Sequence, residues 1–228
     1  MRKLHIKFTI MKMNLPFDTH VAEYEEWFEE HPFVFQSEVE AIRQMLPDGE
    51  QLRGIEVGLG TGQFSNALGI KEGIEPAAGM REVAQERGIE VFDAVAENLP
   101  YEDMRFDFVL MNCCVSYFHD LHVAFKEAMR VLKKNGVLVV GFIDREQAIG
   151  QYYEAHKPES TFYKQAKFYS VDKVVFELTQ AGFKHFDFCQ TLFLPLEEIT
   201  EFEHAKPGYG EGSFVVIQAR KKGNISLA

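Results

Sequence analysis

Apolar and polar positions follow a regular order through the middle of this chain. Short apolar runs, typical of buried strands, alternate with longer stretches that have the spacing of amphipathic helices. This alternation extends from residue 52 to about residue 143, and it predicts successive βαβ units around a parallel sheet. The strand expected at residues 106–111 is too apolar for a surface position. The pattern therefore predicts an α/β fold with a doubly wound, mostly parallel sheet.

The segments before this core have a different pattern. Residues 1–19 show no clean period and are expected to extend over the surface or fray. Two helices are expected next, at residues 21–31 and 34–46. Three ring-bearing residues share one face of the first helix at i, i+3, i+7 spacing: Tyr24, Trp27 and His31. These rings either pack as an ordinary helix core or cover a ligand pocket.

The segments after residue 143 complete the predicted fold. The pattern predicts helices at 144–156 and 171–180, separated by a loop, and strands at 183–193 and 213–220. A polar connection without a regular crossover helix joins the two strands, so they should pair antiparallel. The final strand of the sheet is therefore expected to be antiparallel to its neighbours.

Composition limits the class of protein. A length of 228 residues and 46% hydrophobic residues suit one domain with a full core, so we expect a single domain over residues 1–228. The net charge of −11 disfavours nucleic acid as a partner and favours a small molecule. No run of eighteen apolar residues occurs, so no membrane span is expected. Three cysteines without a C-x-x-C pair suit a reducing cytoplasm.

A glycine-rich turn follows the first predicted strand of the core. Glu56 precedes three glycines at alternate positions, Gly58, Gly60 and Gly62, and a helix is expected to start at Gln63. Glycines leave room for a ligand, and the helix N-terminus would point N–H groups at it. A dinucleotide fingerprint would have a third glycine where Gln63 stands. The acidic residue followed by G-x-G-x-G instead resembles motif I of class I S-adenosylmethionine-dependent methyltransferases.

The next two strand ends extend this resemblance. Glu75 ends a short second strand, where a carboxylate can accept hydrogen bonds from ribose hydroxyls. The segment from residue 73 through Pro76 to Met80 resembles motif II, which implies that Met80 packs on the adenine or else in the helix core. Residues 89–100 resemble motif III, which implies that the backbone at Ala96 and Glu97 faces the adenine.

One position departs from the family pattern. Many relatives have an Asp just before the Ala of motif III, whereas this chain has Val95, and Asp93 is the alternative acceptor for the adenine amino group. The strand at 106–111 resembles motif IV, and its carboxyl end carries Asn112 and Cys113 as cofactor-binding candidates. Residues 127–136 match an E-x-x-R-V-L-K-x-x-G pattern that is frequent in the small-molecule, type 11-like branch of the family.

The resemblance implies a Rossmann-like methyltransferase fold, S-adenosylmethionine as cofactor, and methyl transfer to a small-molecule acceptor by direct displacement. It also implies an N-terminal extension with a helical lid over residues 1–48, a cofactor-binding core over 51–143, and acceptor-side helices with terminal strands over 144–228. Two alternatives stay open at this point: an NAD(P)-dependent oxidoreductase on a dinucleotide fold, and a non-catalytic S-adenosylmethionine-binding regulator.

Few residues suggest acid–base chemistry. His119 follows the fourth strand and is the candidate base, although His119 and Asp120 could simply cap the next helix. The candidates for the acceptor pocket are Tyr24, Trp27, His31, Tyr117 and Tyr152. Four residues could be assembled into a zinc site on paper, namely Cys113, Cys114, His119 and His122, but their spacing fits no familiar ligand pattern. We therefore expect no metal.

Overall fold

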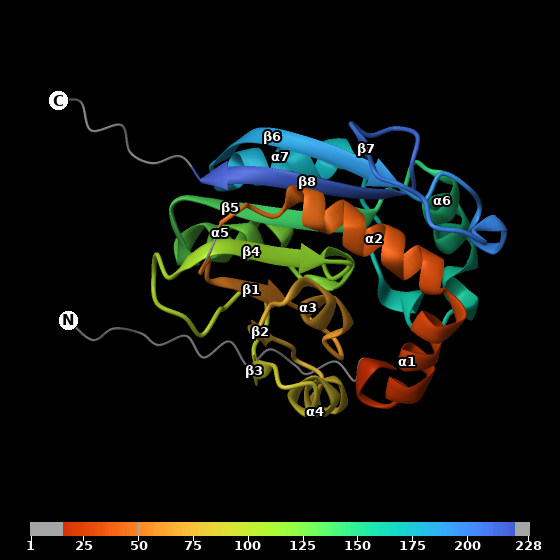
Figure 1. Ribbon diagram of the computed structural model, residues 1–228, viewed down its shortest axis with the longest axis horizontal. Coiled ribbons are helices and arrows are strands. Elements are labelled where there is room, and N and C mark those ends of the chain that lie inside the picture. The colour runs from red at the N-terminus through yellow and green to blue at the C-terminus, as the bar shows by residue number, and fades with distance from the viewer. Residues whose placement is uncertain (1–15, 50, 222–228) are drawn as a thin grey trace.

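The computed structural model describes residues 16–49 and 51–221. Within these residues, eight strands form one sheet in the order β3-β2-β1-β4-β5-β8-β6-β7 (Figure 1). The strands are β1 (Gly54–Val57), β2 (Glu72–Ile74), β3 (Glu90–Phe92), β4 (Phe106–Asn112), β5 (Leu132–Ile143), β6 (Phe183–Thr191), β7 (Lys206–Pro207) and β8 (Phe214–Lys221). Strands β1 to β5 are mutually parallel. Strand β8 is antiparallel to both β5 and β6, so the predicted mostly parallel sheet with a final antiparallel strand is confirmed.

Seven α-helices and five short 3₁₀ helices surround the sheet in the described part of the chain. The α-helices are α1 (Val21–Glu30), α2 (Pro32–Met45), α3 (Gln63–Leu68), α4 (Ala78–Glu86), α5 (Leu121–Val131), α6 (Ala148–His156) and α7 (Val171–Ala181). The 3₁₀ helices are η1 (Pro16–Asp18), η2 (Val115–Tyr117), η3 (Lys157–Glu159), η4 (Tyr163–Gln165) and η5 (Leu196–Glu198).

Local sequence signals explain several helix ends. Pro32 occupies the first turn of α2, where its missing N–H costs nothing. The Asp120 carboxylate accepts a hydrogen bond from the Val123 N–H and caps α5, while Ser170 caps α7 in the same way. Helix α7 ends at Gly182, whose φ of 107° few other residues adopt without strain.

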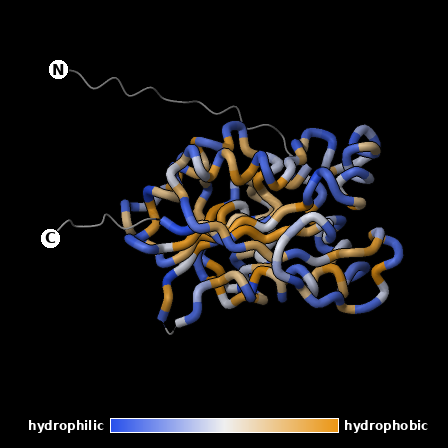
Figure 2. Tube along the Cα trace, turned by 90° about the horizontal axis from the view of Figure 1, so that it is seen from above, coloured by the Kyte–Doolittle hydropathy of each residue, from blue (hydrophilic) through white to orange (hydrophobic). Residues whose placement is uncertain are grey.

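Alternate side chains of the buried strands face two helical layers. One face packs against α5 and α7 through residues such as Val109 and Val140, and the other packs against α2 through residues such as Leu110 and Val139. Figure 2 shows this as a central band of hydrophobic strands between more polar outer segments.

Helix α2 differs from its expected role. The sequence predicts a lid made of two N-terminal helices, but α2 has a buried apolar face that covers the sheet beside β6 and β8 (Figure 1). Helix α1 has no buried residue and lies at the carboxyl edge of the parallel strands. Of the two predicted lid helices, only α1 therefore has the position of a lid. The expected fraying of residues 1–19 lies mostly outside the described residues, and Pro16–Asp18 form η1 against α4.

Candidate functional site

A cavity of about 920 Å³ lies at the carboxyl edge of β1, β2 and β4. Open α/β sheets bind ligands at this edge. The glycine turn and the segments after β2 and β3 line one part of the cavity. Aromatic residues from η1, α1, α6 and the segment around η4 line the other. A volume of this size accommodates a cofactor and a small second molecule together.

The three glycines of the turn have positive φ values, and a side chain at each would meet a different neighbour. A Cβ on Gly60 (φ 58°) would lie 2.9 Å from the Tyr24 hydroxyl oxygen, so Tyr24 of α1 lies directly over the turn. A Cβ on Gly58 (φ 69°) would lie 2.7 Å from the Cβ of Cys114. A Cβ on Gly62 would meet Ile89 at 2.4 Å, which makes Gly62 a packing residue that does not line the cavity.

Two buried carboxylates belong to this part of the molecule. Glu75, 7% exposed, lines the cavity and accepts hydrogen bonds from the N–H groups of Gly60 (3.0 Å) and Ala77 (2.8 Å). Loss of solvent raises its pKa to about 7, although both hydrogen bonds act in the opposite direction. Glu56 faces away from the cavity toward α3, where it accepts a hydrogen bond from the Ser65 hydroxyl. Burial raises the pKa of Glu56 to about 8.

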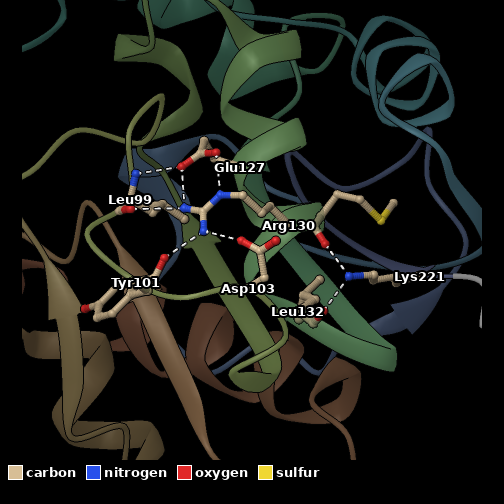
Figure 3. Close-up of polar contacts among 8 residues, drawn as sticks. Leu99, Tyr101, Asp103, Glu127, Arg130, Leu132 and Lys221 are labelled. Atoms are coloured by element: carbon tan, nitrogen blue, oxygen red, sulfur yellow. Dashed lines mark hydrogen bonds and ion pairs between the residues drawn. The ribbon is translucent and has the colours of Figure 1, made fainter. Parts of the chain in front are cut away.

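The loop after β3 is held by an ion pair on α5. Glu127 accepts a hydrogen bond from the Leu99 N–H at 2.9 Å. Arg130 binds both oxygens of Glu127 and donates to the carbonyls of Leu99 (3.1 Å) and Tyr101 (2.7 Å) (Figure 3). Arg130 also pairs with Asp103 at 2.9 Å. This cluster, which we call the α5 staple, fixes the end of the loop that carries Ala96 and Glu97.

Ala96 and Glu97 both line the cavity, together with Pro76. The Glu97 carboxylate accepts hydrogen bonds from the N–H groups of His119 (2.8 Å) and Asp120 (3.2 Å), which ties this loop to the start of α5. Asp93 also lines the cavity, and its carboxylate pairs with Arg81 at 3.2 Å.

The carboxyl end of β4 presents two unusual residues. Asn112 is 5% exposed and lines the cavity, and neither atom of its amide has a hydrogen-bond partner among the described residues. Gly141 makes room for it, because a Cβ there would lie 2.5 Å from the Asn112 amide oxygen. Cys113 has a φ of 52°, which is rare for a residue with a side chain, and its thiol opens onto the cavity.

His119 lines the cavity and is exposed. The residue that caps α5 is its neighbour Asp120. Two of the four residues considered as zinc ligands have other partners: the Cys114 thiol donates to the Val57 carbonyl, and His122 faces Glu177. Within residues 16–49 and 51–221, no three His, Cys, Asp or Glu side chains are arranged to hold a metal ion.

The predicted acceptor residues fall into two groups. Tyr24, Trp27 and Tyr117 line the cavity. His31 does not; it stacks on Trp27 with ring centres 4.7 Å apart. Tyr152 does not line the cavity, because it is 44% exposed on the outer face of α6. Its neighbour Tyr153 is buried and lines the cavity instead. Met80 is fully buried in α4 and also lies outside the cavity lining.

Several cavity residues carried no recognised signal in the sequence, and four of them matter for the site. Phe17 and Asp18 come from η1, where Asp18 accepts a hydrogen bond from the Ala78 N–H at the start of α4. Phe162 packs against Phe17 with ring centres 5.2 Å apart. Glu38 of α2 is 4% exposed and lines the cavity. A charged residue on the apolar face of a helix pattern is the signal that would have identified Glu38.

The comparisons with known proteins agree with this geometry. A family model described as a methyltransferase domain matches residues 55–140. The crystal structure of an S-adenosylmethionine-dependent methyltransferase from Thermotoga maritima, described as a possible histamine N-methyltransferase, is 46% identical with a TM-score of 0.87 and covers 91% of this chain and 98% of its own. An uncharacterised Methanocaldococcus jannaschii protein is 40% identical over 205 residues, 90% of this chain and 98% of the relative.

A more distant structure shares the fold alone. Phosphoethanolamine N-methyltransferase 2 from Haemonchus contortus, solved with S-adenosyl-L-methionine, is 14% identical with a TM-score of 0.65 over 90% of this chain and 57% of its own.

The sheet order, the glycine turn and the carboxylate after β2 define a Rossmann-like enzyme that binds a nucleoside cofactor. The chain belongs to the S-adenosylmethionine-dependent methyltransferases, a family whose cofactor is S-adenosylmethionine. This membership replaces the alternative of an NAD(P)-dependent oxidoreductase. Among the described residues, no helix has the length and apolar character needed to cross a membrane.

Proposed function

We propose that this enzyme methylates a small molecule that occupies the aromatic part of the cavity. The observation that carries the proposal is that one cavity contains both the glycine turn and the aromatic rings. A cofactor on the turn and an acceptor among the rings would therefore share one space. The net charge of −11 argues against a nucleic-acid acceptor, and so does the excess of acidic over basic residues in the cavity lining.

The residues around the turn fit the cofactor. Gly58 and Gly60 leave the backbone open to a ligand, and each Glu75 oxygen keeps a lone pair for a ribose hydroxyl. Ala96 and Glu97, which line the same cavity, would flank the adenine. The unpartnered amide of Asn112 has both a donor and an acceptor to offer a bound molecule. When bound, S-adenosylmethionine supplies a methyl group on a positively charged sulfur, which is already activated for displacement.

The protein's own contribution is to orient the acceptor and exclude water. Methyl transfer by displacement depends on alignment of the reacting atoms, and packed rings hold a flat or apolar acceptor with little freedom. Phe17, Tyr24 and Phe162 contact one another and bring η1 and α1 over the cavity. His119 stays the candidate base, and loss of its imidazole should lower turnover by about a hundredfold if it accepts a proton.

The acceptor is proposed from one further observation. The Thermotoga maritima protein, 46% identical, is described as a possible histamine N-methyltransferase. Histamine is therefore the first acceptor to test, alongside small amines, phenols and carboxylates, by measuring S-adenosylhomocysteine release. Methylation of at least one small molecule, with none of tRNA or DNA, supports the proposal. Turnover with nucleic acid only would refute it.

A further inference from the structure

Glu38 is a buried acid without a partner in the described part of the chain. It lies on α2, is 4% exposed, lines the cavity, and forms no hydrogen bond or ion pair with the other described residues. The remaining buried carboxylates of the described chain are each satisfied: Glu56 by Ser65, Glu72 by Arg53 and Arg105, Glu75 by two N–H groups, and Asp144 by the Glu146 N–H. Glu38 is thus the exception among them.

The surroundings of Glu38 are aromatic. Rings of Tyr24, Trp27, Tyr117, Tyr153 and Tyr163 line the same cavity, and Tyr153 lies against Tyr163 with ring centres 4.5 Å apart. Burial raises the pKa values of the Tyr153 hydroxyl on α6 and the Cys113 thiol after β4, and the negative charge of Glu38 raises both further. Glu38 therefore faces the acceptor part of the cavity, close to the end of β4.

The charge of the cavity favours a cationic ligand. Eight acidic residues line it, against a single lysine, Lys167, among the described residues. Burying a carboxylate without a counter-charge costs several kcal/mol, and a cationic ligand would remove that cost. Aromatic faces also attract cations, whereas an anionic ligand would be repelled. A neutral acceptor would leave the carboxyl unpaired.

We propose that Glu38 binds the protonated amino group of the methyl acceptor, so that the acceptors are small amines with a flat or apolar body. This inference rests on the proposed function and adds the substrate class and the residue that selects it. The burial of Glu38 also predicts a linked proton. Loss of solvent raises its pKa to about 8, so the Glu38 carboxyl is mostly neutral at pH 7 before an acceptor binds.

Binding of an ammonium group should ionise this carboxyl and release about one proton. The nearby Cys113 and Tyr153 stay protonated, because burial raises the pKa of each well above neutrality. The other charged or titratable groups on the cavity wall are the remaining acids, Lys167, His119, Cys114 and the tyrosines Tyr24, Tyr117 and Tyr163. Substitution of Glu38 therefore distinguishes a proton released by its carboxyl from a proton released by one of these other groups.

Three probes with the same ring separate charge from shape: 2-phenylethylamine, 2-phenylethanol and 3-phenylpropionate. Their binding is measured by calorimetry on the full chain loaded with S-adenosylhomocysteine. We expect the native protein to bind the amine most tightly. Glu38→Gln should lower the affinity for the amine at least about tenfold and change the affinity for the alcohol less than twofold. The control variant Glu29→Gln removes one exposed charge of α1 outside the cavity, and it should leave the affinities for the amine and for the alcohol unchanged.

Proton release is measured by repeating the titration at pH 7 in buffers of different ionisation enthalpy. The native protein should release about one proton per amine and Glu38→Gln none. If Glu38→Gln does not fold, Glu38→Met, an apolar residue of similar volume, replaces it. Unchanged amine affinity in the variant, no detectable amine binding, or tighter binding of the alcohol or the carboxylate overturns the proposal.

Turnover separates this inference from the proposed function. Methylation of a hydroxyl or carbon acceptor at a rate independent of Glu38 would leave the proposed function standing and overturn the amine assignment. Amine binding that depends on Glu38, with no methyl transfer to any small molecule, would refute the proposed function instead.

Discussion

Arg130 of the α5 staple should be needed both for stability and for cofactor binding. Arg130→Met keeps the apolar stem and deletes the guanidinium, which is 30% exposed. The change removes two hydrogen bonds to backbone carbonyls and the two-pronged contact with Glu127. Hydrogen bonds to charged groups contribute about 1.5–3 kcal/mol each when buried, and the partial exposure here reduces that contribution. We expect the free energy of unfolding to fall by about 2–4 kcal/mol.

The same change should weaken the cofactor site without touching it. Leu99 would lose its carbonyl partner while Glu127 still accepts from its N–H, so the loop with Ala96 and Glu97 becomes less fixed. Ordering that loop again on binding costs free energy, and we expect S-adenosylhomocysteine to bind about tenfold more weakly, equivalent to ~1.4 kcal/mol. Urea unfolding and calorimetric titration measure the two effects.

A matched control uses the ion pair between Lys133, at the start of β5, and Asp107 of β4. Lys133→Met removes the 2.7 Å contact between the Lys133 side chain, which is 44% exposed, and the Asp107 carboxylate, which is 26% exposed. The free energy of unfolding should fall by less than about 1 kcal/mol. It should leave cofactor affinity unchanged. If Arg130→Met unfolds within 1 kcal/mol of the native protein, or binds S-adenosylhomocysteine equally well, the staple does not position the loop.

Four further predictions follow from the cavity. Glu75→Gln should weaken S-adenosylhomocysteine by roughly 1.5–3 kcal/mol in calorimetry, because one amide cannot accept both backbone N–H groups; equal affinity would contradict this. Gly60→Val, which adds a Cβ beneath the Tyr24 hydroxyl at a positive φ, should keep its circular dichroism yet lose cofactor binding. The pKa of Glu38 is raised to about 8 and that of Glu75 to about 7, against a usual 4.5, so the folded protein favours the protonated carboxyls. Their contribution to the free energy of unfolding is complete below pH 4.5 and is lost as the pH rises to 7–8. Calorimetric scans should therefore give a lower Tm at pH 8.5 than at pH 5.5, with a smaller drop in Glu38→Gln; an identical drop would be inconsistent. Cofactor binding should shift the emission of Trp27, the sole tryptophan, and slow hydrogen exchange in α1; exchange that stays fast with cofactor product and acceptor bound would show that α1 is no lid.

The sequence predicts the core of this fold well because its signals are local. Apolar runs and glycine spacing are properties of short segments, and they locate β1, the turn after it and β4 closely. Antiparallel pairing of β6 and β8 follows from the missing crossover helix. The segment 157–170, expected as a loop, contains η3 and η4, because 3₁₀ turns leave no periodic signal.

The acceptor side of the cavity is less predictable because it is assembled from distant segments. Phe17, Phe162 and Glu38 meet only once η1, the η4 segment and α2 have packed. Tyr152 and Tyr153 are adjacent in the sequence, and a helix turned by about 100° exposes one and buries the other. A hydrophobic pattern alone does not decide which of two tyrosines faces inward.

The position of β8 has a consequence for how the chain acquires its structure. β8 lies between β5 and β6, although both precede it in the sequence. A nascent chain therefore presents two unpaired strand edges until residues 214–221 leave the ribosome, and such edges invite pairing with other chains. The pairing of β5 with β8 also joins residues about 75 positions apart, which makes it a slow, late step of folding by its contact order. Refolding rates and aggregation of this enzyme should thus depend most on how quickly β8 finds its place.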